Sequence, residues 1–260
     1  MTLLTERCDI VFHLAAAVGV ELIVADPVRT IETNIRGSEV VLETANRFNK
    51  KVILASTSEV YGKSEQVPFS EEDDAVLGAT VQSRWSYSCS KMIDEFLALA
   101  YHKQFALPVI VVRPFNTIGP RQTGQYGMVV PRFIRAALRG DPIRVFGSGE
   151  QTRSFVYVKD VVEALLKLAD EPRAVGDVFN LGSDQEIKII DLAETIKRLT
   201  ESDSEIVLVP YDEAYGQKVD DLKRRLPDLT KIKRLIGYES STSLEETLKI
   251  VVSSIKRELH

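Results

Sequence analysis

Two short apolar runs, each closed by polar side chains, constrain the fold more than any other feature of this chain. Residues 52–55 read Val-Ile-Leu-Ala and continue into Ser-Thr-Ser-Glu at 56–59, whereas residues 109–112 read Val-Ile-Val-Val and continue into Arg-Pro-Phe-Asn at 113–116. Apolar runs of this length are typical of buried strands. In open α/β sheets, ligands bind at the carboxyl ends of parallel strands. We therefore predict an α/β fold in which both strand ends face one crevice.

A tyrosine and a lysine lie between these runs, in a helix predicted over residues 85–106. Tyr87 and Lys91 are four residues apart and therefore share one helix face. A free tyrosine has a pKa of about 10, too high for a base at neutral pH, but an adjacent ammonium lowers it. The pair predicts a general base for a substrate hydroxyl, although it also fits a solvated helix face. The residues expected on the buried side of this helix are Phe96, Leu97, Leu99 and Ala100.

Composition excludes several classes of protein. The net charge of −5, from 33 basic and 38 acidic residues, gives no electrostatic footprint for nucleic acid or an anionic membrane. No apolar run approaches the ~20 residues of a membrane span. Two cysteines, Cys8 and Cys89, make no disulfide framework, and three scattered histidines predict no metal site. We expect a cytoplasmic enzyme or binding protein.

The segment 143–160 has the pattern of a strand, a glycine turn and a second strand. Arg153 lies just after the turn, where a guanidinium is suited to grip a phosphate through two hydrogen bonds. A lone arginine would more often lie on the surface. Residues 63–84 are polar and acidic and predict a loop over the crevice.

Three of these segments together resemble one enzyme family. Residues 56–62 (Ser-Thr-Ser-Glu-Val-Tyr-Gly), the Tyr87/Lys91 pair and residues 113–116 are similar to the extended short-chain dehydrogenase/reductases that modify nucleotide sugars. The resemblance implies a Rossmann-type parallel sheet that binds NAD, mainly in residues 1–120. It also implies a smaller C-terminal α/β region that binds a UDP-sugar, mainly in residues 121–260 and interleaved with the end of the sheet. A homodimer is expected.

The resemblance also implies roles for individual residues. Tyr87 takes the proton of the sugar 4-hydroxyl while NAD takes the hydride, and Lys91 lowers the pKa of Tyr87 and binds the nicotinamide ribose. Thr57 hydrogen-bonds the reacting oxygen, and Glu59 is catalytic in the decarboxylases of the family. The residues implied to contact NAD are Ala15, Ala16, Asn34, Ser56 and Pro114, together with Tyr87 and Lys91. The residues implied to contact the UDP-sugar are Asn116, Phe146, Arg153 and Arg225, with Arg224 as an alternative to Arg225.

The chain departs from the family at its beginning. Complete members open with a Gly-x-x-Gly-x-x-Gly turn that holds the cofactor pyrophosphate at a helix N-terminus, and this sequence contains no such motif. Its first predicted strand, residues 9–14, matches the family's fourth, so we expect exposed apolar edges and weak NAD binding. Three interpretations stay open: a fragment or misplaced start, a short relative that binds UDP-sugars without turnover, and a chain completed by a partner.

The reaction has alternatives as well. A 4-keto sugar can accept hydride on its other face, which gives epimerisation, or it can lose carbon dioxide when it carries a C5 carboxylate. Residues 15–43 look like those of UDP-glucose 4-epimerases, whereas 57–59 and 84–91 resemble UDP-glucuronate decarboxylases. Ser58 stands where the dehydratases have an aspartate, which argues against dehydration. We place the epimerase first, the decarboxylase second and non-catalytic binding third.

Overall fold

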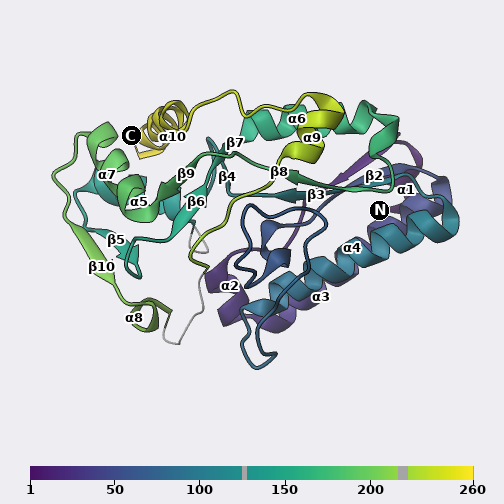
Figure 1. Ribbon diagram of the computed structural model, residues 1–260, viewed down its shortest axis with the longest axis horizontal. Helices are drawn as coiled ribbons and strands as arrows, with labels where there is room; N and C mark the ends of the chain where they lie inside the picture. Colours follow the sequence, from purple (N-terminus) through teal and green to yellow (C-terminus); the bar gives the residue numbers. More distant parts are fainter. Residues whose placement is uncertain (125–127, 216–221, 260) are drawn as a thin grey trace.

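A four-stranded parallel sheet with helices on both faces organises the chain (Figure 1). The computed structural model describes residues 1–124, 128–215 and 222–259. In spatial order the strands are β1 (Ile10–His13), β2 (Lys51–Ala55), β3 (Val109–Pro114) and β8 (Val178–Leu181). One face is covered by α3 (Pro27–Phe48) and α4 (Trp85–Phe105), the other by α6 (Val158–Asp170) and α9 (Thr230–Ile236). The predicted α/β fold with a Rossmann-type sheet is confirmed.

The apolar runs form strands because both of their faces are buried. In β2, Val52 and Leu54 pack in the cluster under α3 and α4, whereas Ile53 packs against α6 and α9. In β3, Val111 packs on the side of α3 and α4, and Val112 packs on the side of α6 and α9. All five of these β2 and β3 side chains are fully buried. A strand covered on both sides has no solvent-facing positions, which explains the continuous apolar pattern.

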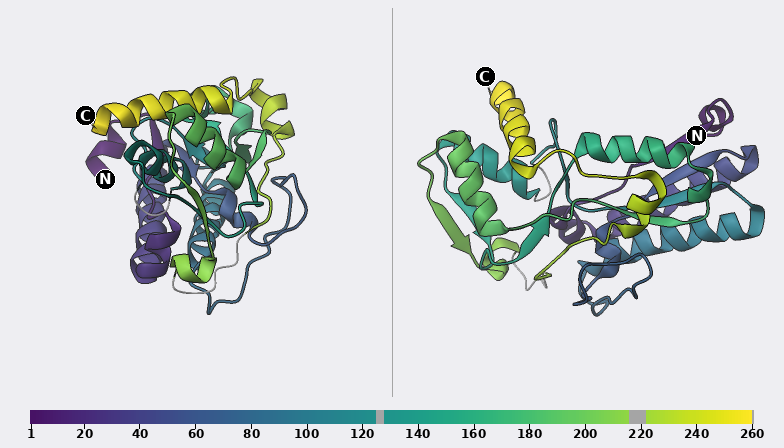
Figure 2. Two further views of the ribbon diagram at one scale, coloured as in Figure 1. Left: turned by 90° about the vertical axis from the view of Figure 1, so that its left-hand side faces the viewer. Right: turned by 45° about the horizontal axis from the view of Figure 1, so that its top comes forward.

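A smaller region built from the later part of the chain stands beside the sheet (Figure 2). Its core is enclosed by α5 (Val129–Arg139), α7 (Ile189–Thr200) and α10 (Leu244–Leu259) around the parallel pair β5 (Ile143–Phe146) and β10 (Ile206–Val209). Two further pairs join it to the sheet: β6 (Thr152–Ser154) with β9 (Glu186–Lys188), and β4 (Thr117–Ile118) with β7 (Val156–Tyr157). The short helices are α1 (Thr2–Glu6), α2 (Val20–Ala25), η1 (Ser58–Tyr61), η3 (Pro172–Ala174) and α8 (Tyr211–Tyr215).

The predicted strand, glycine turn and strand of 143–160 exist, but they do not pair with each other. Strand β5 pairs with β10 and β6 pairs with β9, so each finds its partner far along the chain. Residues 216–221, in the segment after β10 that the sequence predicts as a charged loop over 211–224, lie outside the described residues. Because β8 completes the sheet from beyond residue 120, a division at that point stays a prediction.

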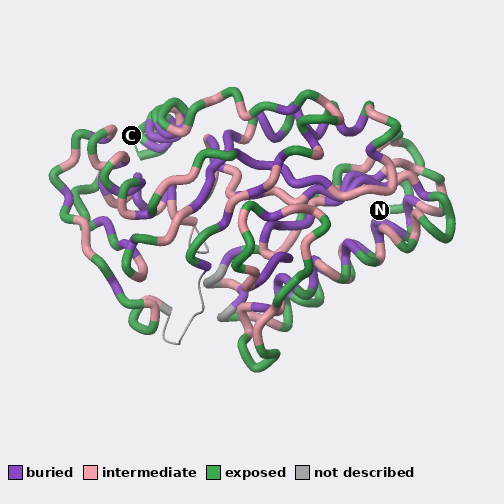
Figure 3. Tube along the Cα trace, viewed as in Figure 1, coloured by how far each residue is buried: buried purple, intermediate pink, exposed green. Residues whose placement is uncertain are grey.

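The outer side of α4 differs from the expectation. Phe96 is 66% exposed and Ala100 is also exposed, whereas Leu97 and Leu99 are partly buried. Exposed and buried stretches alternate along this helix (Figure 3). Phe96 follows Tyr87 by nine residues, which at about 3.6 residues per turn places it on the opposite face of the helix. Since Tyr87 points inward, Phe96 must point outward, and the prediction of a buried Phe96 was wrong.

Strand β1 lies at one end of the described sheet, with β2 as its neighbour. Phe12, Leu14 and Val18, in and after this strand, are 38%, 56% and 41% exposed. The expected exposure of apolar side chains at this edge is therefore confirmed. Among the described helices, none combines the length and apolar character that crossing a membrane requires. A cytoplasmic location stays a prediction.

Candidate active site

A cavity of about 540 Å³ lies where β2 and β3 end and the C-terminal region begins. It receives residues from both regions, as expected for a crevice at the carboxyl ends of parallel strands. The predicted site residues that line it are Ala16, Ser56, Thr57, Glu59, Tyr87, Pro114, Asn116, Phe146, Arg153 and Arg225. Ala15, Asn34 and Lys91, which were also predicted, do not line it. Further lining residues that the sequence analysis did not single out are Arg84, Gln122, Arg132, Gln151 and Tyr211.

Tyr87 stands at the inner wall of this cavity, in the first turn of α4, and is 6% exposed. Its phenol shares a hydrogen bond with the Thr57 hydroxyl, which in turn accepts a hydrogen bond of 3.2 Å from the Glu59 backbone nitrogen. Burial raises the pKa of Tyr87 well above its ordinary value. The Thr57 hydrogen bond lowers that pKa in part, the carboxylates of Glu59 and Asp94 raise it, and Arg225 lowers it.

The ammonium of Lys91 is paired with Asp94. Its ammonium lies 2.6 Å from the Asp94 carboxylate, and the two side chains are 1% and 0% exposed. Burial raises the pKa of Tyr87 in this structure, and the effect of Lys91 on that pKa stays a prediction. The spacing of Tyr87 and Lys91 places them on one helix face without deciding which neighbour the ammonium contacts.

Asn34 has a structural role beside the site. Its side-chain oxygen accepts a 2.7 Å hydrogen bond from the Ala17 backbone nitrogen, and its amide donates to Ser90 at 3.1 Å. This buried amide therefore ties the turn after β1 to α4. Burial also lowers the pKa of His13, which Lys91 lowers further and Asp94 raises, and a ring nitrogen of His13 lies 3.3 Å from the Ser38 hydroxyl. His13 is a partly buried residue at the end of its strand.

Glu59 lies between two arginines. Arg225 contacts one carboxylate oxygen at 2.6 Å, and Arg84 lies 3.6 Å from the other. The side chains are 20% exposed for Glu59 and 8% and 9% for Arg225 and Arg84, so the cluster is largely shielded from water. Arg225, not Arg224, reaches the cavity, since Arg224 pairs with Glu186 outside it. Arg84 lies three residues before Tyr87, just before the helix, and no signal in the sequence distinguishes it from an ordinary residue at that place.

The far end of the cavity carries aromatic and basic groups. The Arg132 guanidinium lies 3.8 Å from the centre of the Phe146 ring. Arg153, which is 8% exposed, donates hydrogen bonds to the carbonyl oxygens of Thr152 at 2.7 Å and Leu222 at 2.8 Å. A planar ring beside guanidinium groups suits a base and an anionic phosphate. In the described part of the chain, no group of three His, Cys, Asp or Glu side chains is placed to hold a metal ion.

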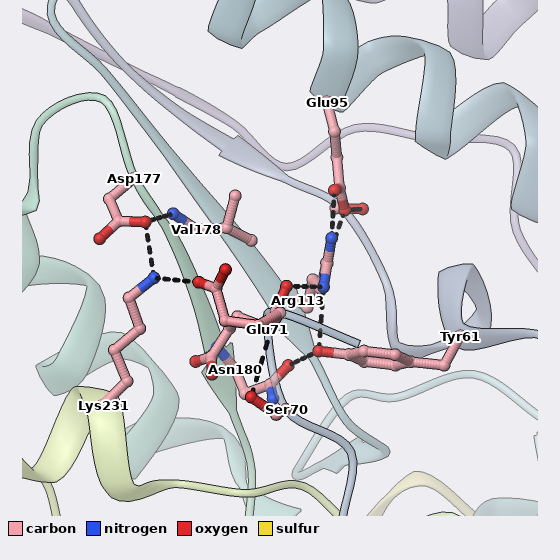
Figure 4. A network of polar contacts seen from close by, with 11 residues as sticks. Tyr61, Ser70, Glu71, Glu95, Arg113, Asp177, Val178, Asn180 and Lys231 are labelled. Carbon is pink, nitrogen blue, oxygen red and sulfur yellow. Dashed lines mark hydrogen bonds and ion pairs between the residues drawn. The ribbon is translucent and has the colours of Figure 1, made fainter. Parts of the chain in front are cut away.

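A polar network behind β3 fixes the strand ends (Figure 4). Arg113 donates two hydrogen bonds to Glu95, at 3.0 and 2.7 Å, and one to the Tyr61 hydroxyl at 3.0 Å. Tyr61 donates onward to Asn180 at 2.6 Å, and Ser56 donates to Glu95. Burial alone would lower the pKa of Arg113, but Glu95 outweighs it and raises that pKa, while burial raises the pKa of Tyr61 to about 12.

We expect Arg113→Met to destabilise the fold by about 3–5 kcal/mol, because it leaves the buried carboxylate of Glu95 without its partner. Urea denaturation followed by circular dichroism measures this loss. Arg144→Met is the matched control, since the Arg144–Glu213 pair is 56% and 64% exposed and should contribute less than about 1 kcal/mol. Equal stability of the two variants would contradict the role of the network.

The cavity fits one end of a dinucleotide. Ala16, Ser56, Tyr87 and Pro114 line its sheet side, where small side chains let a flat ring approach the strand ends. They are four of the residues that the resemblance assigns to NAD.

Comparison with known proteins identifies the family. The sequence model of the NAD dependent epimerase/dehydratase family matches residues 1–182. The chain is 46% identical over 247 residues to the UDP-N-acetyl-α-D-glucosaminuronate decarboxylase of Bacillus cytotoxicus, covering 95% of this chain and 76% of that protein. It is 39% identical to UDP-glucuronic acid decarboxylase 1 of Xenopus tropicalis, covering 96% of this chain and 58% of that protein.

A solved structure shows the same architecture. The UDP-glucose 4-epimerase of Thermotoga maritima, determined with UDP-glucose, superposes with a TM-score of 0.88 at 32% identity. The superposition covers all of this chain (100%) and 82% of the epimerase. The fold is thus shared by proteins named for different reactions, and the choice of reaction depends on the residues of the site.

Proposed function

The chain belongs to the NAD-dependent epimerase/dehydratase family, a family of enzymes, and from this premise we propose that it is a UDP-uronate decarboxylase. The observation that carries this choice is the position of Glu59 between Arg84 and Arg225 in the cavity. The sequence analysis placed UDP-glucose 4-epimerase first and the decarboxylase second. The comparisons favour the second, because the relatives at 46% and 39% identity are both decarboxylases.

The charges of the site support an acidic sugar. Arg84 and Arg225 both lie against Glu59 beside Tyr87, in a region with little access to water. Guanidinium groups bind carboxylates through charged hydrogen bonds. The C5 carboxylate of a UDP-uronate offers the arginines such a group, whereas the neutral hexose of UDP-glucose offers none. The sugar class that fits is therefore a uronate, with or without a 2-acetamido group.

Each residue then has a defined task. NAD would be held beside Ala16, Ser56, Tyr87 and Pro114, where it would supply a hydride acceptor for C4 of the sugar. Tyr87 accepts the proton of the 4-hydroxyl, and Thr57 holds the phenol by its hydrogen bond. The resulting 4-keto uronate is a β-keto acid, so the bond from C5 to the carboxylate breaks and its electrons move toward the 4-oxygen. Glu59, held by Arg225, is the acid–base group proposed to return a proton to C5.

Binding tests this assignment without turnover. We expect calorimetry on the 260-residue chain to show UDP-glucuronate binding more tightly than UDP-glucose. A charged hydrogen bond contributes about 1.5–3 kcal/mol, which is a ratio of about 10–100 in Kd. Arg84→Met should remove most of this preference while Arg225 still holds Glu59. Arg144→Met, outside the cavity, is the control, and an unchanged preference in Arg84→Met would count against the arginine pair.

A second copy of the chain is the proposed partner. On α4, Ile93 and Phe96 are 48% and 66% exposed, and Val40 on the adjacent α3 is 44% exposed. Apolar surface of this kind marks interaction sites. We expect light scattering to show a dimer that Phe96→Glu converts to a monomer. Val81→Glu is the control, because Val81 lies in the 63–84 loop and is 90% exposed. A dimer that survives Phe96→Glu would place the interface elsewhere.

A further inference from the structure

One buried acid beside the site has no task in the reaction described above. Asp94 is 0% exposed, and its second carboxylate oxygen, Oδ1, has no hydrogen-bond partner within the described residues. Burying a carboxylate is costly unless its charge is compensated. Lys91 is the compensating group, at 2.6 Å from Oδ2. The ion pair therefore links Lys91, a predicted catalytic residue, to Asp94, which the sequence analysis did not name.

The geometry of α4 gives Lys91 two possible partners. Tyr87, Lys91 and Asp94 fall within about 60° of each other around the helix axis, because residues three and four apart share one face. Helical side chains lean toward the N-terminus of the helix, so an unrestrained Lys91 would extend toward Tyr87. In the structure its ammonium contacts Asp94, one turn in the other direction.

We propose that Asp94 is a positioning residue that holds Lys91 away from Tyr87 and thereby keeps Tyr87 in its protonated, resting form. Tyr87 becomes a base when Lys91 leaves Asp94 and approaches the phenol. This inference deepens the proposed function, since it depends on Tyr87 as the base, but it concerns the chain's own groups and needs no turnover to be tested.

The surrounding charges are compatible with this control. The strand β1 contributes His13, η1 contributes Glu59, and the segment before α9 contributes Arg225. From β3, Arg113 is engaged by Glu95, also on α4. Helix α3 presents the uncharged side chains Asn34 and Ser38 to this region. Asp94 is among the groups that raise the pKa of Tyr87.

The test is the titration of Tyr87 in the 260-residue chain, followed by NMR of tyrosine labelled with ¹³C at Cζ and assigned with Tyr87→Phe. We expect Asp94→Asn to lower the midpoint by about 1–3 pH units, the usual effect of a nearby opposite charge. In a Lys91→Met background the same substitution should shift it much less. Asp177→Asn, which breaks the distant pair with Lys231, should leave it unchanged.

Two results would overturn the proposal. One is an unchanged midpoint in Asp94→Asn, and the other is an equal shift with and without Lys91, which would mean that Asp94 acts by its own charge alone. If Asp94→Asn does not fold, a measurement on the wild-type chain still tests the Lys91–Asp94 pair. A correlation across the hydrogen bond between Lys91 ¹⁵Nζ and Asp94 ¹³Cγ is expected, and its absence, with fast exchange of the ammonium protons, contradicts the pair. All of these measurements are independent of substrate and reaction.

Discussion

Tyr87→Phe should reduce turnover of a UDP-uronate by about 10⁴-fold, the upper end of what a general base contributes, with NAD supplied in excess. The substitution removes the one oxygen of this side chain that can accept the 4-hydroxyl proton, and it removes the partner of Thr57. The ring remains, so the cavity keeps its shape and UDP should still bind. Activity measured by product formation, beside UDP binding measured by calorimetry, separates chemistry from binding.

Tyr101→Phe is the matched control for this experiment. Tyr101 lies on the same helix but packs against Phe105, with 5.6 Å between ring centres, and does not line the cavity. Its activity should stay close to that of the unaltered chain. Activity retained in Tyr87→Phe would show that another group removes the proton, and the assignment of the base would be wrong.

Glu59→Gln should lower decarboxylation by about 10²-fold or more, since it removes an acid–base group while keeping its size. It should also let the two arginines bind the substrate carboxylate more tightly, because the competing negative charge of Glu59 is removed. The expected result is therefore a fall in kcat with KM unchanged or lower. Steady-state kinetics on UDP-glucuronate and UDP-N-acetylglucosaminuronate measures both constants.

The same substitution distinguishes the two reactions. A simple 4-epimerase needs no carboxylate at this position, so Glu59→Gln would leave interconversion of UDP-glucose and UDP-galactose nearly intact. Glu72→Gln is the control, because its side chain is 87% exposed on the 63–84 loop. Full decarboxylase activity in Glu59→Gln would show that Glu59 is an ion-pair partner of Arg225 and has no acid–base role.

The sequence predicted those parts of the site that strand ends determine. Ser56, Thr57 and Asn116 follow β2 and β3, and parallel strands bring their carboxyl ends to one edge regardless of the rest of the fold. Arg153 could be placed only through the family resemblance, because its strand pairs with residues 186–188 of the chain. Local pattern contains no information about such distant pairing.

The partner that a charged side chain contacts was harder to predict than the place of the residue in the fold. Helical spacing placed Lys91 beside Tyr87, but Asp94 satisfies the same rule on the other side, and only the packed structure shows which contact is made. Likewise Arg84 reads as an ordinary residue before a helix until η1 brings Glu59 to it. Both cases involve long, charged side chains whose direction depends on tertiary neighbours.

The measurement that tests the central proposal most directly is product analysis after incubation with NAD and, separately, UDP-glucuronate, UDP-N-acetylglucosaminuronate and UDP-glucose. The account predicts release of carbon dioxide and appearance of a UDP-pentose, or its 2-acetamido counterpart, from a uronate, with UDP-glucose left unchanged. Conversion of UDP-glucose to UDP-galactose, with no carbon dioxide from either uronate, would contradict it and restore the 4-epimerase as the function.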